Sequence, residues 1–361
     1  MPTHPANSLA HIFRIAGLGL AVAASLLFRA EYQGDESEGL TLALLAALAA
    51  FGFILLLSGS VRQAISYWLL SALALFLMAP FVWMVLISLH PPKTPIPPLS
   101  QILPVAQAEV EGPDGKPVMI AGDGGKQEAK TEPRITPNWS NYDFVFNHEN
   151  LPVKRFLFNS LFVTVTVVAL QLFITSLAAY GFARVRFKGR EIVFALFLGS
   201  MMFAGPVTQI PVYLMIRNFG WLDTYNALIV PGISSAFSVF LLRQFFMQIP
   251  IELDEAARID GAGDFRIYSK VIMPLSKAAL ATAAAFTFFG VWTDFFNPMI
   301  YTNTTEMRTL EVGLSIFKNS YGGTNWPLQM TAAVIVMLPL LIVFMFTQRY
   351  FTKGIMLGSI K

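Results

Sequence analysis

Apolar residues in this chain are gathered into long stretches, and most of its charged residues lie in the segments between them. A helix needs ~20 mostly apolar residues to cross the ~30 Å hydrocarbon core of a bilayer. The pattern therefore predicts an all-α membrane protein, a polytopic transmembrane helix bundle of about eight spans. The expected spans run roughly over Ala10–Phe28, Leu40–Ser58, Ser66–Leu89, Phe156–Ala183, Ile192–Ile216, Trp221–Phe246, Ala278–Tyr301 and Leu328–Phe346.

The first stretch is open to two interpretations. Its uninterrupted apolar part, Ile15–Phe28, is short and follows His11 and Arg14. A retained helix and a cleaved signal peptide both fit such a segment. We favour the retained helix, which makes residues 1–65 a pair of transmembrane helices ahead of six further spans in residues 66–361.

Lys and Arg residues fall on one side of the bundle if the helices simply alternate. That side is cytoplasmic, because short cytoplasmic loops carry an excess of cationic residues. Both termini then lie inside, and the segment 91–155 lies outside. The cations that set this orientation are Arg62, Arg184, Arg186, Lys188, Arg190, Arg258, Arg266, Lys270, Arg349, Lys353 and Lys361.

The external segment 91–155 is rich in Pro and Gly. Ten of the 22 prolines lie between His90 and Pro137, together with several glycines and charges of both signs. Such a composition cannot build a packed core by itself. A variable external loop is the simpler interpretation, and a docking site for an external partner is the alternative.

Composition narrows the class of protein. Of 361 residues, 55% are hydrophobic and 13% are charged, and the mean hydropathy is +0.58. These values argue against a soluble enzyme and against a disordered chain. The net charge of +3 is too small to indicate a polyanionic partner. The absence of cysteine excludes disulfides, thiolate metal sites and a catalytic thiol.

The segment 249–275 differs from a simple connection. Pro250 suits a first helical position, and the acidic residues after it suit the positive end of a helix dipole. Gly261 and Gly263 supply a stop and a turn, Asp264 can cap a second short helix, and Pro274 can end it. We therefore expect a helix–turn–helix outside the bilayer, in a cytoplasmic loop.

Two surfaces of this loop could receive another protein. Small residues on the first helix and in the turn would allow a close approach of another backbone, and apolar residues on the second helix offer area for burial. The small residues are Ala256, Ala257 and Ala262; the apolar residues are Phe265, Ile267, Tyr268, Val271 and Ile272. A loop helix that merely covers the end of the bundle is the alternative.

The order of residues in this loop favours a functional role. Glu255-Ala256-Ala257-Arg258-Ile259-Asp260-Gly261-Ala262, followed by Pro274, resembles the EAA loop of ATP-binding-cassette (ABC) importer permeases. The resemblance extends from about Ser66 to Lys361 and is to the carbohydrate permeases of the maltose (MalG-like) type. It includes Asn159-Ser-Leu, Ala179-Tyr-Gly-Phe-Ala-Arg184, Pro206, Pro211, Trp326-Pro-Leu-Gln-Met-Thr-Ala-Ala333 and Gln348-Arg-Tyr-Phe-Thr-Lys-Gly354. The first two spans and the long external insert depart from the family pattern.

The resemblance implies a bacterial inner-membrane transport subunit that is not itself an enzyme. A second related permease, two cytoplasmic ATPase subunits and an external sugar-binding protein would be its partners, with a sugar as the substrate. The ATPase subunits would bind ATP and Mg, and this chain would bind no cofactor. Within the loop, Glu255 would be the charged contact to the ATPase, Ala256 and Ala257 the close-packing surface, and Gly261 the bend.

The sequence lacks the motifs for binding a nucleotide or a metal ion, which agrees with ATP binding to a separate ATPase chain. There is no Gly-x-x-x-x-Gly-Lys-Ser/Thr loop to bind a nucleotide phosphate. The four histidines are scattered and have no metal-ligand spacing.

Four polar or aromatic residues within the spans are candidates for lining the solute pathway. Asp294 is a carboxylate in an otherwise apolar span, where an unpaired charge is costly, so a pathway role and a structural pairing are both open. Trp292 and Asn297 could stack on a sugar or hydrogen-bond it, and helix packing is their alternative role. Gln209 lies between Pro206 and Pro211, which are expected to break the helix near mid-membrane.

Two other functions compete with sugar import. The EAA loop is shared by ABC permeases for other solutes such as polyamines or phosphonates, although the residues 326–361 favour carbohydrate. A membrane enzyme or a secondary transporter would need acid–base or ion-coupling residues inside the membrane, and Asp294 is the available candidate.

Overall fold

The computed structural model describes residues 61–92, 103–109, 119–121, 127–129, 131–148, 151–203, 205–321 and 325–357. The expected spans Ala10–Phe28 and Leu40–Ser58, and with them the role of residues 1–65, lie outside the described residues. The chain divides into two compact units. The first comprises residues 1–141 and 324–331, and the second comprises residues 142–323 and 332–361.

The first unit is built on helix α3 (Val61–Ser88), which includes Pro80. Most of its large apolar side chains are exposed in this structure, as expected of a helix whose surroundings are lipid. Its carboxyl end is fixed by Asn141, the second residue of α4 (Ser140–Asn147), whose Nδ2 donates to the carbonyl oxygens of Ser88 (2.7 Å) and His90 (2.8 Å).

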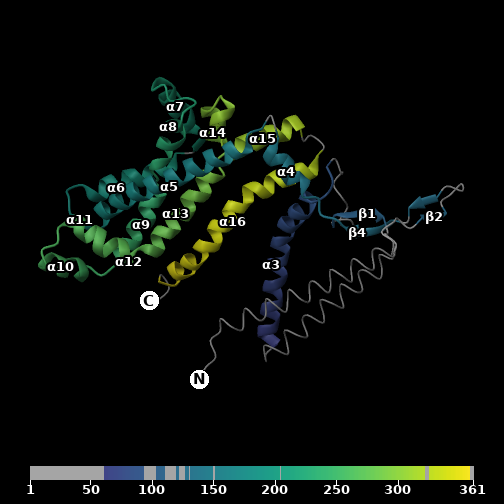
Figure 1. The fold of residues 1–361 in the computed structure, drawn as a ribbon. Helices are drawn as coiled ribbons and strands as arrows, with labels where there is room; N and C mark the ends of the chain where they lie inside the picture. The colour runs from purple at the N-terminus through teal and green to yellow at the C-terminus, as the bar shows by residue number, and fades with distance from the viewer. Residues whose placement is uncertain are drawn as a thin grey trace. The chain divides into compact units, whose positions relative to one another are not determined.

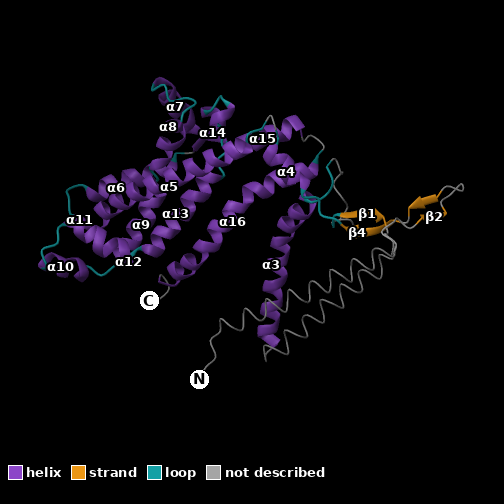
Figure 2. Cartoon of the chain, viewed as in Figure 1, coloured by secondary structure: helices purple, strands orange, loops and turns teal. Residues whose placement is uncertain are grey.

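Short strands follow α3 in the segment that was expected to be an external loop. β1 (Val105–Glu109) pairs antiparallel with β4 (Thr131–Ile135), and β2 (Met119–Ala121) pairs antiparallel with β3 (Gln127–Ala129). In the described part of the chain, strands occur in this segment alone, and helices make up the rest of the regular structure (Figure 2). The predicted helical architecture is confirmed, and the two strand pairs lie within the segment that was expected to be external.

The second unit is organised around α5 (Val153–Arg184), which lies beside α9 (Ala236–Gln248) and α13 (Lys277–Trp292) (Figure 1). Small and polar residues on its buried face let neighbouring helices approach closely, as is usual for helices in membranes. Gln171 joins the three helices, because its Nε2 donates to Ser238 Oγ and Thr287 Oγ1, both at 2.9 Å.

Two expected spans are broken helices. The stretch Ile192–Ile216 forms α6 (Arg190–Gly199), the 3-10 turn η2 (Ser200–Met202) and α7 (Gly205–Asn218), and the helix axis bends by 100° between η2 and α7. Pro206 is the second residue of α7; it suits the first turn of a helix and has no N–H with which to continue a helix from the residues before it. Pro211 was expected to break the helix as well but lies inside α7.

The stretch Ala278–Tyr301 was expected to be one span. The structure ends α13 at Trp292 and begins α14 (Phe296–Tyr301) after a gap of three residues. Asp294 Oδ1 accepts a hydrogen bond from the backbone N–H of Asn297 (3.2 Å), and Pro298 lacks the N–H that a continuous helix would need. The continuous span is therefore a wrong prediction.

The other elements complete the second unit. α8 (Tyr225–Ile229) and the 3-10 turn η3 (Val230–Ile233) lead into α9, and the 3-10 turn η5 (Thr305–Met307) leads into α15 (Leu310–Tyr321). α16 (Trp326–Leu357) begins in the first unit and continues in the second. In the described residues, four helices are long and apolar enough to cross a membrane. Two bent pairs would raise the number to six if each formed one span: residues 190–202 with α7, and residues 264–275 with α13, where the bend is 80°.

Candidate functional site

The segment 249–275 forms two short helical pieces joined by a tight turn. The first is α10 (Glu252–Ile259); the second consists of α11 (Asp264–Ile267), the π-helical turn η4 (Tyr268–Ile272) and α12 (Met273–Leu275). Gly261 has φ of +78°, in the left-handed region that favours glycine. Its N–H donates to Arg258 O (3.0 Å) and the N–H of Ala262 donates to Ala257 O (2.9 Å), which closes the end of α10.

The predicted loop residues divide between an exposed and an inner side. Ala257 and Ala262 are half-buried against the apolar cluster at this end of the bundle. The small side chains therefore bring α10 close to its own bundle as well as leaving room for a partner. The exposed residues are Glu255, Ala256, Asp260, Gly261 and Pro274.

The second helical piece differs from the expectation. Ile267, Tyr268 and Ile272 are at most 5% exposed and belong to the cluster that joins this piece to α5 and α9. They are not available to another protein in this structure, so that part of the expected docking surface is wrong. Phe265 remains, at 70% exposed.

Two charged residues that sequence reasoning did not pair lie beneath α10. Arg184, the last residue of α5, approaches Asp254 with Nε 3.5 Å from Oδ2, and both side chains are nearly buried. Arg184 Nη2 also donates to the carbonyl oxygens of Phe246 (2.8 Å) and Ile249 (2.5 Å). Burial raises the pKa of Asp254, and the Arg184 guanidinium opposes this rise. In the sequence, the position of Arg184 was explained by the excess of cationic residues in cytoplasmic loops alone.

A second buried cation fixes the start of α6. Arg243 of α9 donates from Nη2 to both carboxylate oxygens of Glu191 (3.1 Å each) and from Nε to Phe182 O (3.2 Å). Its guanidinium lies 4.0 Å from the ring centroid of Phe194, close enough for a cation–π contact.

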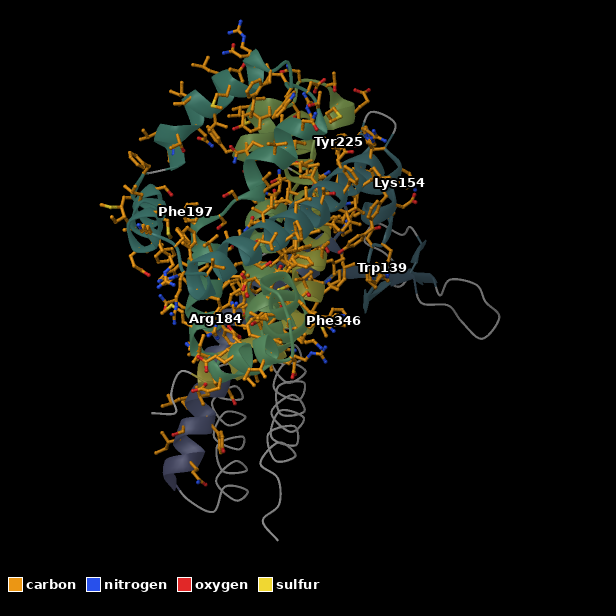
Figure 3. The ribbon with its side chains drawn as sticks, turned by 90° about the vertical axis from the view of Figure 1, so that its left-hand side faces the viewer. Trp139, Lys154, Arg184, Phe197, Tyr225 and Phe346 are labelled. Carbon is orange, nitrogen blue, oxygen red and sulfur yellow. The ribbon has the colours of Figure 1, made fainter. Side chains whose placement is uncertain are left out.

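The opposite end of α5 holds the segment before α15. Lys154 and Arg184 mark the two ends of α5 (Figure 3). Near the Lys154 end, Asn159 Nδ2 donates to the carbonyl oxygens of Glu306 (2.7 Å) and Arg308 (2.9 Å), and Ser160 Oγ accepts from the N–H of Leu310 (2.8 Å). Asn159 Oδ1 also accepts from Tyr225 Oη at 2.7 Å. These contacts explain the Asn-Ser pair that the sequence analysis noted without a role.

Asp223 holds the same region from the loop before α8. Its Oδ1 accepts hydrogen bonds from the N–H groups of Asn303 (2.9 Å) and Thr304 (3.0 Å). Burial by itself raises the pKa of Asp223, but these hydrogen bonds outweigh burial and the pKa is lowered.

Three of the four candidate pathway residues form one chain of hydrogen bonds. Gln209 Nε2 donates to Asn297 Oδ1 (3.1 Å), and Asn297 Nδ2 donates to Asp294 Oδ2 (2.8 Å). Asp294 and Asn297 also line a small cavity of about 20 Å³, enough for about one water molecule. The other residues that line it are Ser160, Val163, Thr164, Leu228, Val291, Pro298 and Thr309.

Trp292 does not join this chain. It is 2% exposed, its indole N–H donates to Val336 O (3.0 Å), and its ring stacks on Phe288 with centroids 5.6 Å apart. The hydrogen bond joins α13 to α16, and the ring stack is a contact between successive turns of α13.

The described residues contain no group of three or more His, Asp or Glu side chains placed to hold a metal ion. The loop 249–275 offers an exposed carboxylate, that of Glu255, on the short helix α10. The second candidate site is the chain of hydrogen bonds from Gln209 through Asn297 to Asp294.

Comparison with known proteins identifies the class. Residues 56–356 match the family described as binding-protein-dependent transport system inner membrane component. The chain belongs to this family. It is therefore a multi-pass inner-membrane component of an ABC transporter, a transport subunit, and the family works in general with a second permease, an ATPase and a binding protein.

Several relatives of this permease have assigned names. It is 34% identical to the arabinooligosaccharides transport system permease protein AraQ of Bacillus subtilis over 230 residues, 64% of this chain and 81% of the relative. It is 36% identical to protein LplC of the same organism over 233 residues, 61% of this chain and 78% of the relative. It is 34% identical to the trehalose/maltose transport system permease protein MalG of Thermococcus litoralis over 225 residues, 61% of this chain and 80% of the relative.

A solved structure has the same fold. A chain in the crystal structure of a bacterial ABC transporter involved in the import of the acidic polysaccharide alginate matches with a TM-score of 0.58 and 24% identity. The match covers 81% of this permease and 96% of that chain.

Proposed function

We propose that this chain is the membrane-spanning permease subunit of an ATP-driven importer for a sugar or oligosaccharide. The observation that carries the proposal is the identity of 34% to permeases named for arabinooligosaccharides and for trehalose/maltose. With a second permease it forms the translocation pathway, and an external sugar-binding protein delivers the solute. Two cytoplasmic ATPase subunits bind ATP with Mg and hydrolyse it.

The proposed topology has eight spans with both termini in the cytoplasm. Two spans precede residue 66, and six follow it: α3, α5, the bent pair of α6 and α7, α8 with α9, α13 with α14, and α16. The segment 91–155 is external, and the loop 249–275 is cytoplasmic. The cations after α5, from Arg184 to Arg190, support this orientation.

The exposed side of α10 is the proposed contact with the ATPase. Glu255 supplies the charge, Ala256 allows close approach, and Asp260 and Gly261 form the rim of the contact. On the other side, Ala257 and Ala262 hold the helix against the bundle, as their partial burial suggests. Pro274 helps to end the second helical piece before α13.

The polar chain of Gln209, Asn297 and Asp294 is the proposed lining of the solute pathway. Amide and carboxylate groups can exchange their mutual hydrogen bonds for bonds to sugar hydroxyls. We leave Trp292 out of the lining, because its indole N–H is bonded to Val336 O and its ring is buried.

Exchange of Glu255 for Lys tests the coupling role. Glu255→Lys reverses the charge at an exposed position, so we expect ATP-driven uptake to be abolished while membrane insertion and yield stay unchanged. The control is Glu252→Lys, the same charge reversal on an exposed residue of the same helical turn. Both variants are compared by uptake assays in cells and by the amount of ATPase that purifies with the tagged chain.

Undiminished uptake by Glu255→Lys would contradict the coupling role.

Purification of the unsubstituted chain from its own membranes, followed by mass spectrometry, tests the assembly itself. A preparation that is intact but contains no ATPase would contradict the proposed importer, and stimulation of the ATPase by a polyamine or phosphonate instead of a sugar would identify a different solute class.

A further inference from the structure

We propose that Arg184 and Asp254 are positioning residues that make α10, α9 and α5 move as one piece, so that a displacement of α10 reaches the far end of the bundle. This inference rests on the proposed coupling role of the loop 249–275.

The ion pair joins three elements at one point. Arg184 ends α5, Asp254 lies on α10, and the Phe246 and Ile249 carbonyls that Arg184 Nη2 contacts lie at the carboxyl end of α9. A guanidinium suits that end of a helix, where carbonyl oxygens lack partners and the helix dipole is negative. A single side chain thus closes α9 and holds α10.

Burial makes separation of the pair unfavourable. The side chains of Arg184 and Asp254 are 5% and 4% exposed. If α10 moved away without α5, each charge would remain in the bundle without its partner, which is strongly disfavoured. Buried ion pairs often add little to stability compared with apolar packing, so a role in fixing one arrangement accounts better for this pair.

The second helical piece of the loop is attached to the same helix. Tyr268 of η4 has its Oη 2.8 Å from Ser176 Oγ, and its ring lies 5.5 Å from that of Tyr180. Ser176 and Tyr180 are two turns and one turn before Arg184 on α5. Both parts of the loop are therefore bound to the last three turns of α5.

α5 carries the connection to the opposite end. Asn159 and Ser160 hold the segment 306–310, and Asn159 lies 25 residues before Arg184 in one continuous helix. At 1.5 Å per residue this separation is roughly 38 Å. A movement of α10 that displaces α5 must therefore also displace the segment 306–310.

We call the Arg184–Asp254 pair, which connects α5, α9 and α10, the joint. Backbone hydrogen exchange in the assembled transporter tests this joint without knowledge of the solute. The complex is purified with its partner chains, and exchange of residues 302–310 is measured by mass spectrometry with and without Mg·ATP. In Asp254→Asn we expect the ATP-dependent change at residues 302–310 to fall about tenfold, within the usual range of coupling between distant sites. ATPase association and ATP hydrolysis should remain. The control is Asp264→Asn, which removes an exposed carboxylate paired with Arg258 in the same loop and should keep the full change.

The outcomes separate this joint from the proposed function. An equal ATP-dependent change in Asp254→Asn and in the unsubstituted complex would overturn the joint alone. No ATP-dependent change in the unsubstituted complex would contradict the coupling role of the loop. If Asp254→Asn does not assemble, Arg184→Lys is measured in the same way, because it keeps the charge and loses the guanidinium geometry that reaches Phe246 O and Ile249 O together.

Discussion

Individual polar residues on α5 do more than their hydropathy indicates. Asn159 uses its whole amide, donating to two carbonyl oxygens and accepting from Tyr225, and it is fully buried. Gln171 joins three helices in the middle of the bundle. Inside a bilayer no water is present to hydrogen-bond these groups, and an unpaired polar group costs free energy. Each of these side chains therefore requires a particular neighbour.

Among the glycines that the structure describes, Gly313 is the one at which an added Cβ would meet the closest neighbouring atom. A Cβ added there would lie 2.1 Å from Phe156 Cδ2, and the Phe156 ring is itself 1% exposed. We expect Gly313→Ala to push α15 away from α5 and to lower the free energy of unfolding by about 1–3 kcal/mol. The thermal transition of the purified complex, followed by tryptophan fluorescence, measures this.

The matched control is Gly290→Ala on α13. Gly290 has no atom within 4 Å of an added Cβ and no left-handed backbone. Alanine should therefore be neutral or slightly stabilising there. Equal loss of stability in both variants would show that α15 does not pack on α5 in the way described.

At the scale of elements, the sequence placed the helices well and their interruptions less well. The break near Pro206 was foreseen because proline removes a backbone hydrogen bond of the helix. The break at residues 293–295 was not foreseen, because the apolar run continues through it. At this break Asp294 Oδ1 accepts a hydrogen bond from the N–H of Asn297, and the hydropathy of the stretch carries no sign of that contact.

The turn between α10 and α11 provides a prediction at this scale. Gly261 has φ of +78°, so Gly261→Ala should destabilise the turn by about 1 kcal/mol. Opening of α10 should then increase about fivefold, measured by hydrogen exchange of the amides of residues 252–259.

Gly263→Ala serves as the control, two residues along the same turn. Its φ is −76°, and nothing lies within 4 Å of an added Cβ. We expect wild-type exchange rates there. If Gly261→Ala also left exchange unchanged, the tight turn would not be what positions α10.

At the scale of the whole molecule, the orientation in the membrane can be tested directly because the chain has no cysteine. Single cysteines are introduced at the exposed residues Glu306 and Lys270. Glu306→Cys should react with a membrane-impermeant maleimide in intact cells, and Lys270→Cys should react only after the membrane is opened. The reverse pattern would invert the proposed topology and place α10 where no cytoplasmic ATPase can reach it.

The sequence by itself determined the class of protein, the position of most spans and the short helices of the loop 249–275. Long apolar runs, glycines at turns and prolines at helix ends act through local physics, so they can be read without knowing the fold. The family resemblance also rested on short local motifs such as residues 255–262. The match of residues 56–356 to the family confirms this resemblance.

The tertiary structure alone decided which residues meet. Asn159 and Glu306 are 147 residues apart, and Gln171 and Thr287 are 116 residues apart. Only folding revealed that Arg184 contacts Asp254, that Trp292 packs against α16, and that the apolar side of the second loop helix faces its own bundle. The reason is that helices in a membrane can pack on any face, so hydropathy shows that a residue is inside the bilayer without showing which neighbour it has.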